Sequence, residues 1–132
     1  MSVTFYATEL RDVQFQGETR PCWDFIDGTP ELNVSNSNAV ALLWSCFDVK
    51  PGDGLCGDMG ITEAIRKLAF WMKHGGPRAL TTPGWESHNP GEPHIICGGR
   101  TLEQTQRYAT KLHEILTFAS LHEGDDIRLG WG

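Results

Sequence analysis

The hydrophobic pattern of the chain is clearest in three stretches that predict helices. Apolar residues spaced three and four positions apart predict amphipathic helices over about 60–74 and 101–122. A nearly continuous apolar run, which includes Trp44, predicts a third helix over about 36–47 that lies near the centre of the core. Thr101, followed by Gln104, fits a capping box at the start of the last helix, so its first turn is well defined.

Short alternating or apolar segments predict strands around these helices. They lie at residues 3–8, 13–15, 22–25, 31–34, 94–97 and 127–131. Gly17-Glu18 is a candidate hairpin turn, Asp58 is a candidate cap for the second helix, and 78–81 is a candidate strand. The pattern therefore predicts a single compact α+β domain over residues 1–132, with a mainly antiparallel sheet packed against three helices.

Residues 75–93 form the longest stretch without a periodic pattern, and they contain four prolines and four glycines. A loop of this length in a compact domain is usually functional or mobile. Trp85 lies in it, and two interpretations stay open: a plug over the core or an anchor for a binding partner. Glu86 and His88 would supply polar contacts beside such an anchor, and Arg78 lies in the same loop.

Composition changes this picture mainly through charge. The chain has 132 residues and a net charge of −6, which fits one domain, and it lacks an apolar run long enough to span a membrane or an N-terminal secretory signal. Residues 1–58 contain nine acids and three bases, whereas residues 59–132 contain eight of each. This excess of acids disfavours nucleic acid as a partner and raises the question of whether the acids share one face.

The four cysteines, Cys22, Cys46, Cys56 and Cys97, form no CxxC pair. Without a secretory signal they are expected to be reduced thiols in the cytoplasm. The spacing of His94 and Cys97 on a strand splays the two side chains apart, so no metal or other cofactor is expected. The sequence shows no cluster of acid, base and nucleophile, which favours a protein that is not an enzyme.

Gly98, Gly99 and Arg100 lie between a predicted strand and a predicted helix. Glycine N–H groups, a helix N-terminus and an arginine together can bind a phosphate or another small anion. The segment matches neither a P-loop nor a dinucleotide-binding motif. A connection of this kind is also common without any ligand.

Several short segments are similar to a group of small uncharacterised bacterial and phage-type proteins. They are Leu32–Ala39 with Leu42-Leu43, Leu55-Cys-Gly57, Ile95–Gly99 and the closing Gly-Trp-Gly. The resemblance implies a bacterial or phage setting and carries no activity with it.

Two hypotheses follow for the function. The first is a non-enzymatic intracellular interaction protein that binds a protein partner or itself, as a homo-oligomer, through the 75–93 loop and the acidic N-terminal part. The second is a protein or enzyme that binds a small phosphorylated ligand, such as a nucleotide, at Gly98-Gly99-Arg100, with the 75–93 loop as a lid.

Overall fold

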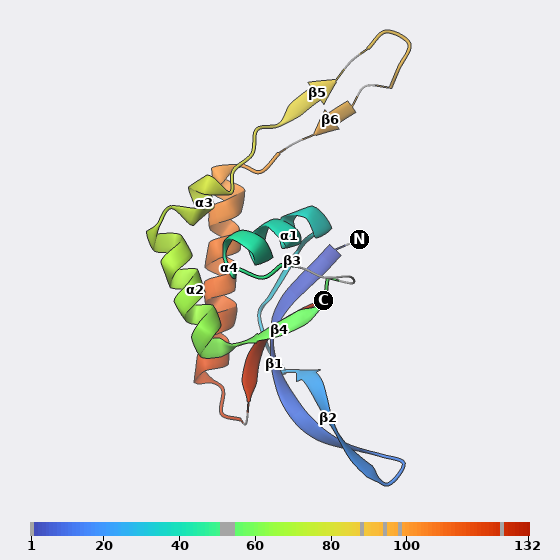
Figure 1. Cartoon of the computed structure of the whole chain (residues 1–132), viewed down its shortest axis with the longest axis vertical. Helices are drawn as coiled ribbons and strands as arrows, with labels where there is room; N and C mark the ends of the chain where they lie inside the picture. The colour runs from blue at the N-terminus through green and yellow to red at the C-terminus, as the bar shows by residue number, and fades with distance from the viewer. Residues whose placement is uncertain (1, 51–54, 88, 94, 98, 125) are drawn as a thin grey trace.

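A long first strand organises the sheet. The computed structural model describes residues 2–50, 55–87, 89–93, 95–97, 99–124 and 126–132. β1 (Ser2–Phe15) pairs along one edge with β3 (Glu31–Ser35) and then with β2 (Glu18–Phe25). Its other edge pairs with β7 (Ile127–Trp131), which in turn pairs with β4 (Gly57–Gly60). All these pairs are antiparallel, so the sheet runs β2-β1-β7-β4, with β3 beside β1 (Figure 1).

The helices lie where the apolar patterns predict them. α1 spans Asn36–Ser45, α2 spans Ile61–Lys73 and α4 spans Leu102–Leu121, each within two residues of its expected ends. The hydroxyl of Thr101 accepts a hydrogen bond of 3.1 Å from the backbone N–H of Gln104, as the capping box predicts. A short fourth helix, α3 (Gly76–Ala79), follows α2 after a turn at Gly75.

The core lies between one face of the sheet and the helices. Val3, Phe5 and Ala7 alternate along β1 and are all buried on this face, and Leu129 and Trp131 of β7 join them from the neighbouring strand. Leu42 and Leu43 of α1, and Leu112, Ile115 and Leu116 of α4, close the core from the helical side. The prediction of one α+β domain with an antiparallel sheet packed against three substantial helices is therefore confirmed.

The opposite face of the sheet is largely polar. Tyr6 and Phe25 place their rings 4.1 Å apart there, and Phe25 is about half exposed. Asn33 donates a hydrogen bond of 2.8 Å to the hydroxyl of Thr4 on the paired strand. In the described part of the chain, the helices pack on the other face (Figure 1).

Four local predictions are wrong. Asp58 lies in β4 and pairs with Arg128 at 2.5 Å, whereas Gly60 begins α2 without a side-chain cap. Residues 78–81 are not a strand, because α3 occupies 76–79. The hairpin turn lies at Gln16-Gly17, one residue earlier than expected, and both residues have positive φ, at 52° and 80°. Trp44 is 60% exposed instead of buried.

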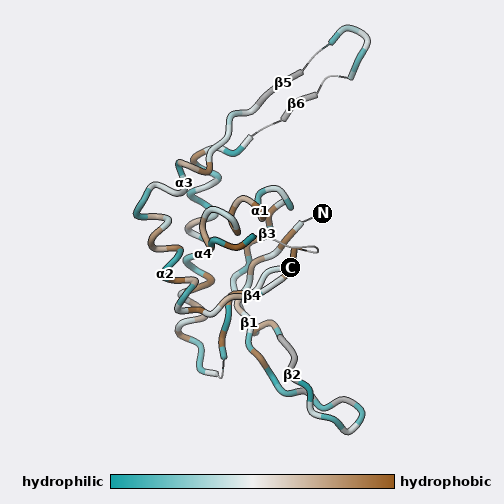
Figure 2. The backbone as a smooth tube through the Cα atoms, in the orientation of Figure 1, coloured by the Kyte–Doolittle hydropathy of each residue, from teal (hydrophilic) through white to brown (hydrophobic). Residues whose placement is uncertain are grey.

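Two hairpins extend away from the body of the molecule. One is formed by the outer part of β1 with β2, and its far end is mostly hydrophilic (Figure 2). The other is formed by β5 (Trp85–Ser87) and β6 (Ile95–Cys97), which make a separate two-stranded sheet. We call residues 83–99 the β5–β6 arm; it rises from the end of the body where α3 and the start of α4 lie (Figure 1).

Candidate functional site

The base of the β5–β6 arm is closed by a pair of backbone hydrogen bonds. Thr82 and Arg100 each donate their N–H to the carbonyl oxygen of the other, at 3.0 Å in both directions. Gly99 lies just inside this pair with φ of +63°, and a Cβ at this position would lie 2.4 Å from the carbonyl oxygen of Thr82. Only glycine fits there without moving the backbone. Gly99 therefore allows the backbone conformation by which the chain leaves the arm and re-enters the body.

Arg100 connects the arm to the helices through its side chain. Its Nε donates to the carbonyl oxygen of Leu80 at 3.0 Å, and its Nη1 donates to Oδ1 of Asn38, on α1, at 3.1 Å. Asn38 and Gln104 in turn donate to the hydroxyl of buried Tyr108, at 3.0 and 2.6 Å. This chain of bonds fixes the arm base against α1 and α4, and it engages the guanidinium that the anion hypothesis needs.

The structure spreads the predicted site residues over the arm and its base. Glu86 lies on β5 and is exposed, as is Arg78 on α3. The backbone of Trp85 begins β5, but its side chain lies outside the described part of the structure, so its two interpretations stay open. His88 and Gly98 also lie outside the described residues. Gly99 and Arg100 form the arm base, and Arg100 donates to the carbonyl oxygen of Leu80, which follows the short helix that contains Arg78.

Two adjoining hollows that share Met72 lie between α2 and α4, and we call them together the α2–α4 groove. Its lower part, of about 490 Å³, is mostly apolar and is lined by Ile65, Leu68, Ala69, Met72, His113 and Leu116, among others. Its upper part, of about 500 Å³, shares Met72 and continues past Pro77, Arg78 and Leu102. Ile65 and Met72 are 41% and 45% exposed, so this apolar surface is open to a partner.

One arginine lines the α2–α4 groove, and a lysine directly follows a lining residue of α2 in the sequence. Arg78 lines its upper part, and Lys73 follows Met72 on the exposed side of α2. Neither cation forms an ion pair within the described part of the chain. The residues that line the groove include no aspartate or glutamate. The groove therefore combines an apolar floor with cations that are available to an acidic partner.

A second hollow, of about 390 Å³, lies between α1 and α2. It is bordered by the two most exposed aromatic side chains of the described residues, Trp44 at 60% and Phe70 at 66%. Asp48 lines the same hollow. The ammonium group of Lys67 is already engaged there, because it donates to the carbonyl oxygen of Phe47 at 2.9 Å and lies 3.5 Å from Glu63. Arg66 also lines this hollow, so its charge is mixed, whereas the lining of the α2–α4 groove contains no acid.

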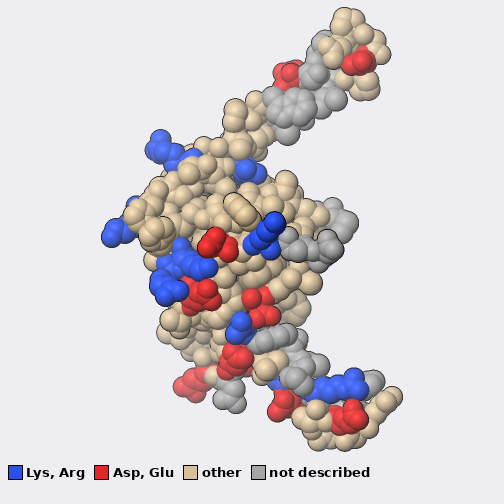
Figure 3. Space-filling model, viewed as in Figure 1, with Lys and Arg blue, Asp and Glu red and all other residues tan. Residues whose placement is uncertain are grey.

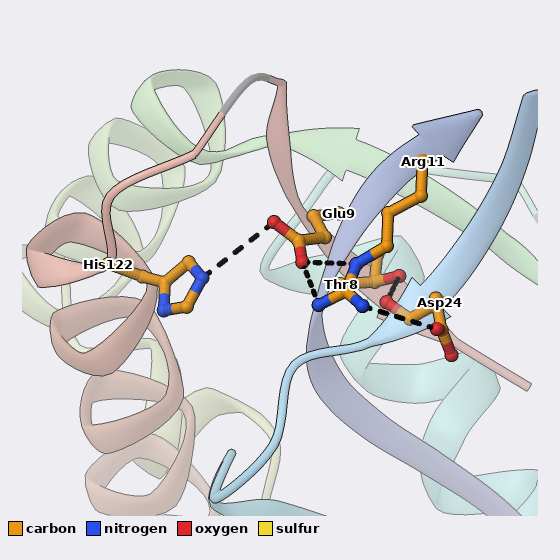
Figure 4. Close-up of polar contacts among 5 residues, drawn as sticks. All are labelled: Thr8, Glu9, Arg11, Asp24 and His122. Carbon is orange, nitrogen blue, oxygen red and sulfur yellow. Dashed lines mark hydrogen bonds and ion pairs between the residues drawn. The ribbon is translucent and has the colours of Figure 1, made fainter.

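Several acids of the N-terminal part form local ion pairs, among them Glu9, Glu18, Asp24 and Asp58. Glu9 is nearly buried between Arg11 and His122, whose Nε2 lies 3.7 Å away (Figure 4). Asp24 accepts a hydrogen bond of 2.6 Å from Thr8 through its backbone carbonyl and lies 3.9 Å from Arg11 through its carboxylate. The cluster joins the base of the β1–β2 hairpin to the end of α4. It is a structural contact, and it raises the pKa of Arg11 through the hydrogen bond and charge of Glu9.

The described residues contain no group of three or more His, Cys, Asp or Glu side chains that could hold a metal ion. Cys46 is buried, as predicted, and its burial raises the pKa of the thiol to about 12, which keeps it protonated at neutral pH. Cys56 is exposed. None of the helices in the described ranges combines the length and apolar character needed to cross a bilayer.

Sequence reasoning missed the α2–α4 groove and the hollow between α1 and α2. The apolar stripe of α2 was the available signal, because it includes Ile65 and Met72 and is wider than the core needs. No protein-family model, curated protein or solved structure matches the chain. The resemblance to small bacterial and phage-type proteins therefore stays a prediction from the sequence.

Proposed function

We propose that the chain is a non-enzymatic interaction protein that associates with further copies of itself through the β5–β6 arm. The observation that carries this proposal is the arm itself, which extends from the body as a separate two-stranded sheet (Figure 1). Each of its strands has three residues. The acidic composition favours a protein partner over nucleic acid, and the cysteine usage favours a cytoplasmic setting.

The physical argument is that such a hairpin has little stability of its own. A two-stranded hairpin alone in water is marginally stable at best, because it lacks a surface on which to bury its side chains. Ordering its backbone costs roughly 1–2 kcal/mol for each residue. A partner surface that covers the arm would offset this cost, so the arm is most useful to the protein when it contacts another molecule.

The open edges of the arm support the same interpretation. In a two-stranded sheet each strand has one edge whose N–H and C=O groups are not paired with a neighbouring strand. Such edges commonly receive a strand or lie against a surface of another chain. The anchoring of the base by Arg100 and Gly99 holds the arm in a defined direction, which lowers the entropy lost on binding.

Excision of the arm tests this function directly. Because Thr82 and Arg100 exchange two hydrogen bonds, residues 83–99 can be replaced by a two-residue Asn-Gly turn that joins them. We expect the excised protein to be monomeric in sedimentation equilibrium, where the intact chain forms oligomers, and to keep its melting temperature within about 2 °C. An intact chain that stays monomeric at high protein concentration would contradict the proposal, as would an excised chain that still associates.

A further inference from the structure

The surface that receives the arm can be identified by its charge and its apolar character. Between residues 83 and 99 the chain contains Glu86 and Glu92 and no lysine or arginine. Both acids are exposed. Figure 3 shows acidic groups on the arm without basic ones beside them, and basic groups over the helical side of the body. A positively charged acceptor would complement the net negative charge of the arm.

The helices supply that charge. Across α2, α3 and α4 there are six bases and three acids, a net charge of +3. The other hairpin, over residues 9–27, contains five acids and two bases, a net charge of −3. Two arms of like charge would repel each other, so arm-to-arm pairing is disfavoured. The helical side is the surface of a second copy that complements the arm.

We infer that the β5–β6 arm of one copy lies in the α2–α4 groove of the next, with Glu86 and Glu92 near Lys73 and Arg78. This inference rests on the proposed function and names its acceptor. The groove meets both requirements of a docking surface, because exposed Ile65 and Met72 give it apolar area and its cations lack partners within the described ranges. The hollow at Trp44 and Phe70 is the weaker acceptor, because Asp48 lines it beside Arg66 and would repel an acidic arm, whereas no acid lines the groove.

An arm and a groove at different places on the molecule make a head-to-tail contact. Each copy then uses its arm on one neighbour and offers its groove to another, which produces a ring or a filament. This geometry can be separated experimentally from a symmetric dimer. A copy with only a working arm and a copy with only a working groove should still combine once.

The experiment uses two variants of the full chain. The arm variant is Glu86→Lys/Glu92→Lys, and the groove variant is Lys73→Glu/Arg78→Glu. Each variant alone should associate at least about 10-fold more weakly than the wild type, because like charges then face each other. A mixture of the two variants should regain growth into larger assemblies, because the reversed arm then faces the reversed groove and the unchanged arm faces the unchanged groove. The groove variant mixed with the arm-excised chain, which has a groove and no arm, should instead form a 1:1 complex by sedimentation velocity and multi-angle light scattering, and should grow no further.

A matched control carries the same change of charge on the other flank of α4. Arg107→Glu/Lys111→Glu alters two bases that line the hollow facing β3 and not the α2–α4 groove. It should associate like the wild type. Equal loss in this control would show that only overall charge matters and would overturn the inference.

A further outcome separates the two proposals. If excision of the arm abolishes association but the groove variant associates like the wild type, the arm is confirmed and the groove is wrong. If the intact chain is monomeric, both proposals fail.

Discussion

Gly76 lies at a position where there is no room for a side chain larger than hydrogen. A Cβ at this position would lie 2.2 Å from the indole of Trp71, which is buried at the end of α2. Gly76 begins α3 against this ring, and both residues are buried, so a methyl group there would overlap the indole.

We expect Gly76→Ala to destabilise the fold by about 1–3 kcal/mol, the usual cost of overpacking a core. Gly60→Ala is the matched control, because a Cβ there meets nothing within 4 Å and its φ is −59°. Thermal unfolding should show a melting temperature lower by several degrees for Gly76→Ala and little change for Gly60→Ala. Equal melting temperatures in the two variants would contradict the close packing of Trp71.

Arg100 distinguishes the two hypotheses from the sequence, because only the second requires its side chain to bind a ligand. Its guanidinium donates to Leu80 and Asn38, so Arg100→Ala leaves both acceptors without this donor. We expect a loss of about 1–3 kcal/mol in unfolding free energy, whereas Arg78→Ala, at an exposed position, should change it by less than about 0.5 kcal/mol. Chemical denaturation of the two variants measures both changes in unfolding free energy.

The same variants test the anion hypothesis. Inorganic phosphate should shift the melting temperatures of the wild type and of Arg100→Ala equally if Arg100 is structural, because its general effect as an excluded salt is the same for both. Stabilisation of the wild type that disappears in Arg100→Ala would instead support a ligand at Gly98-Gly99-Arg100.

At the level of elements, the sequence predicts helices better than strands. The 3.6-residue period is a local signal, so α2 and α4 end within two residues of their expected positions. β4 was missed because its sequence, Gly-Asp-Met-Gly, has no alternation and its pairing with β7 depends on residues about 70 positions away. The arm was missed as a hairpin for the same reason, since its strands of three residues are surrounded by proline and glycine.

The candidate site was predictable only in part. The Gly-Gly-Arg segment before a helix cap drew attention to Gly99 and Arg100, and both are structurally important at the arm base. Asn38, the partner of Arg100, lies 62 positions earlier in the chain, and no local pattern connects the two. Trp44 lies in a run that is apolar on all sides, so the sequence could not show which side of α1 faces outward.

At the scale of the whole molecule, the net charge of −6 conceals a separation of charge. Counted over the sequence, the β1–β2 hairpin and the β5–β6 arm have a net negative charge and the helices have a net positive charge. Figure 3 shows acidic and no basic groups on the arm, and mixed charges elsewhere. Charges separated in this way favour contacts between unlike ends of two copies over contacts between like ends.

Salt dependence follows from this separation. Between about 0.05 and 0.5 M NaCl the Debye length shortens from roughly 14 Å to about 4 Å, so attraction between an exposed acidic arm and exposed cations is largely screened. We expect the dissociation constant for self-association to rise by about 10-fold over this range, measured by sedimentation equilibrium. The groove variant Lys73→Glu/Arg78→Glu should show the opposite dependence and associate more tightly as salt rises, because salt then screens a repulsion. An interface formed by apolar contacts alone would strengthen or stay constant in salt, and that result would contradict the role of Glu86 and Glu92 in the contact.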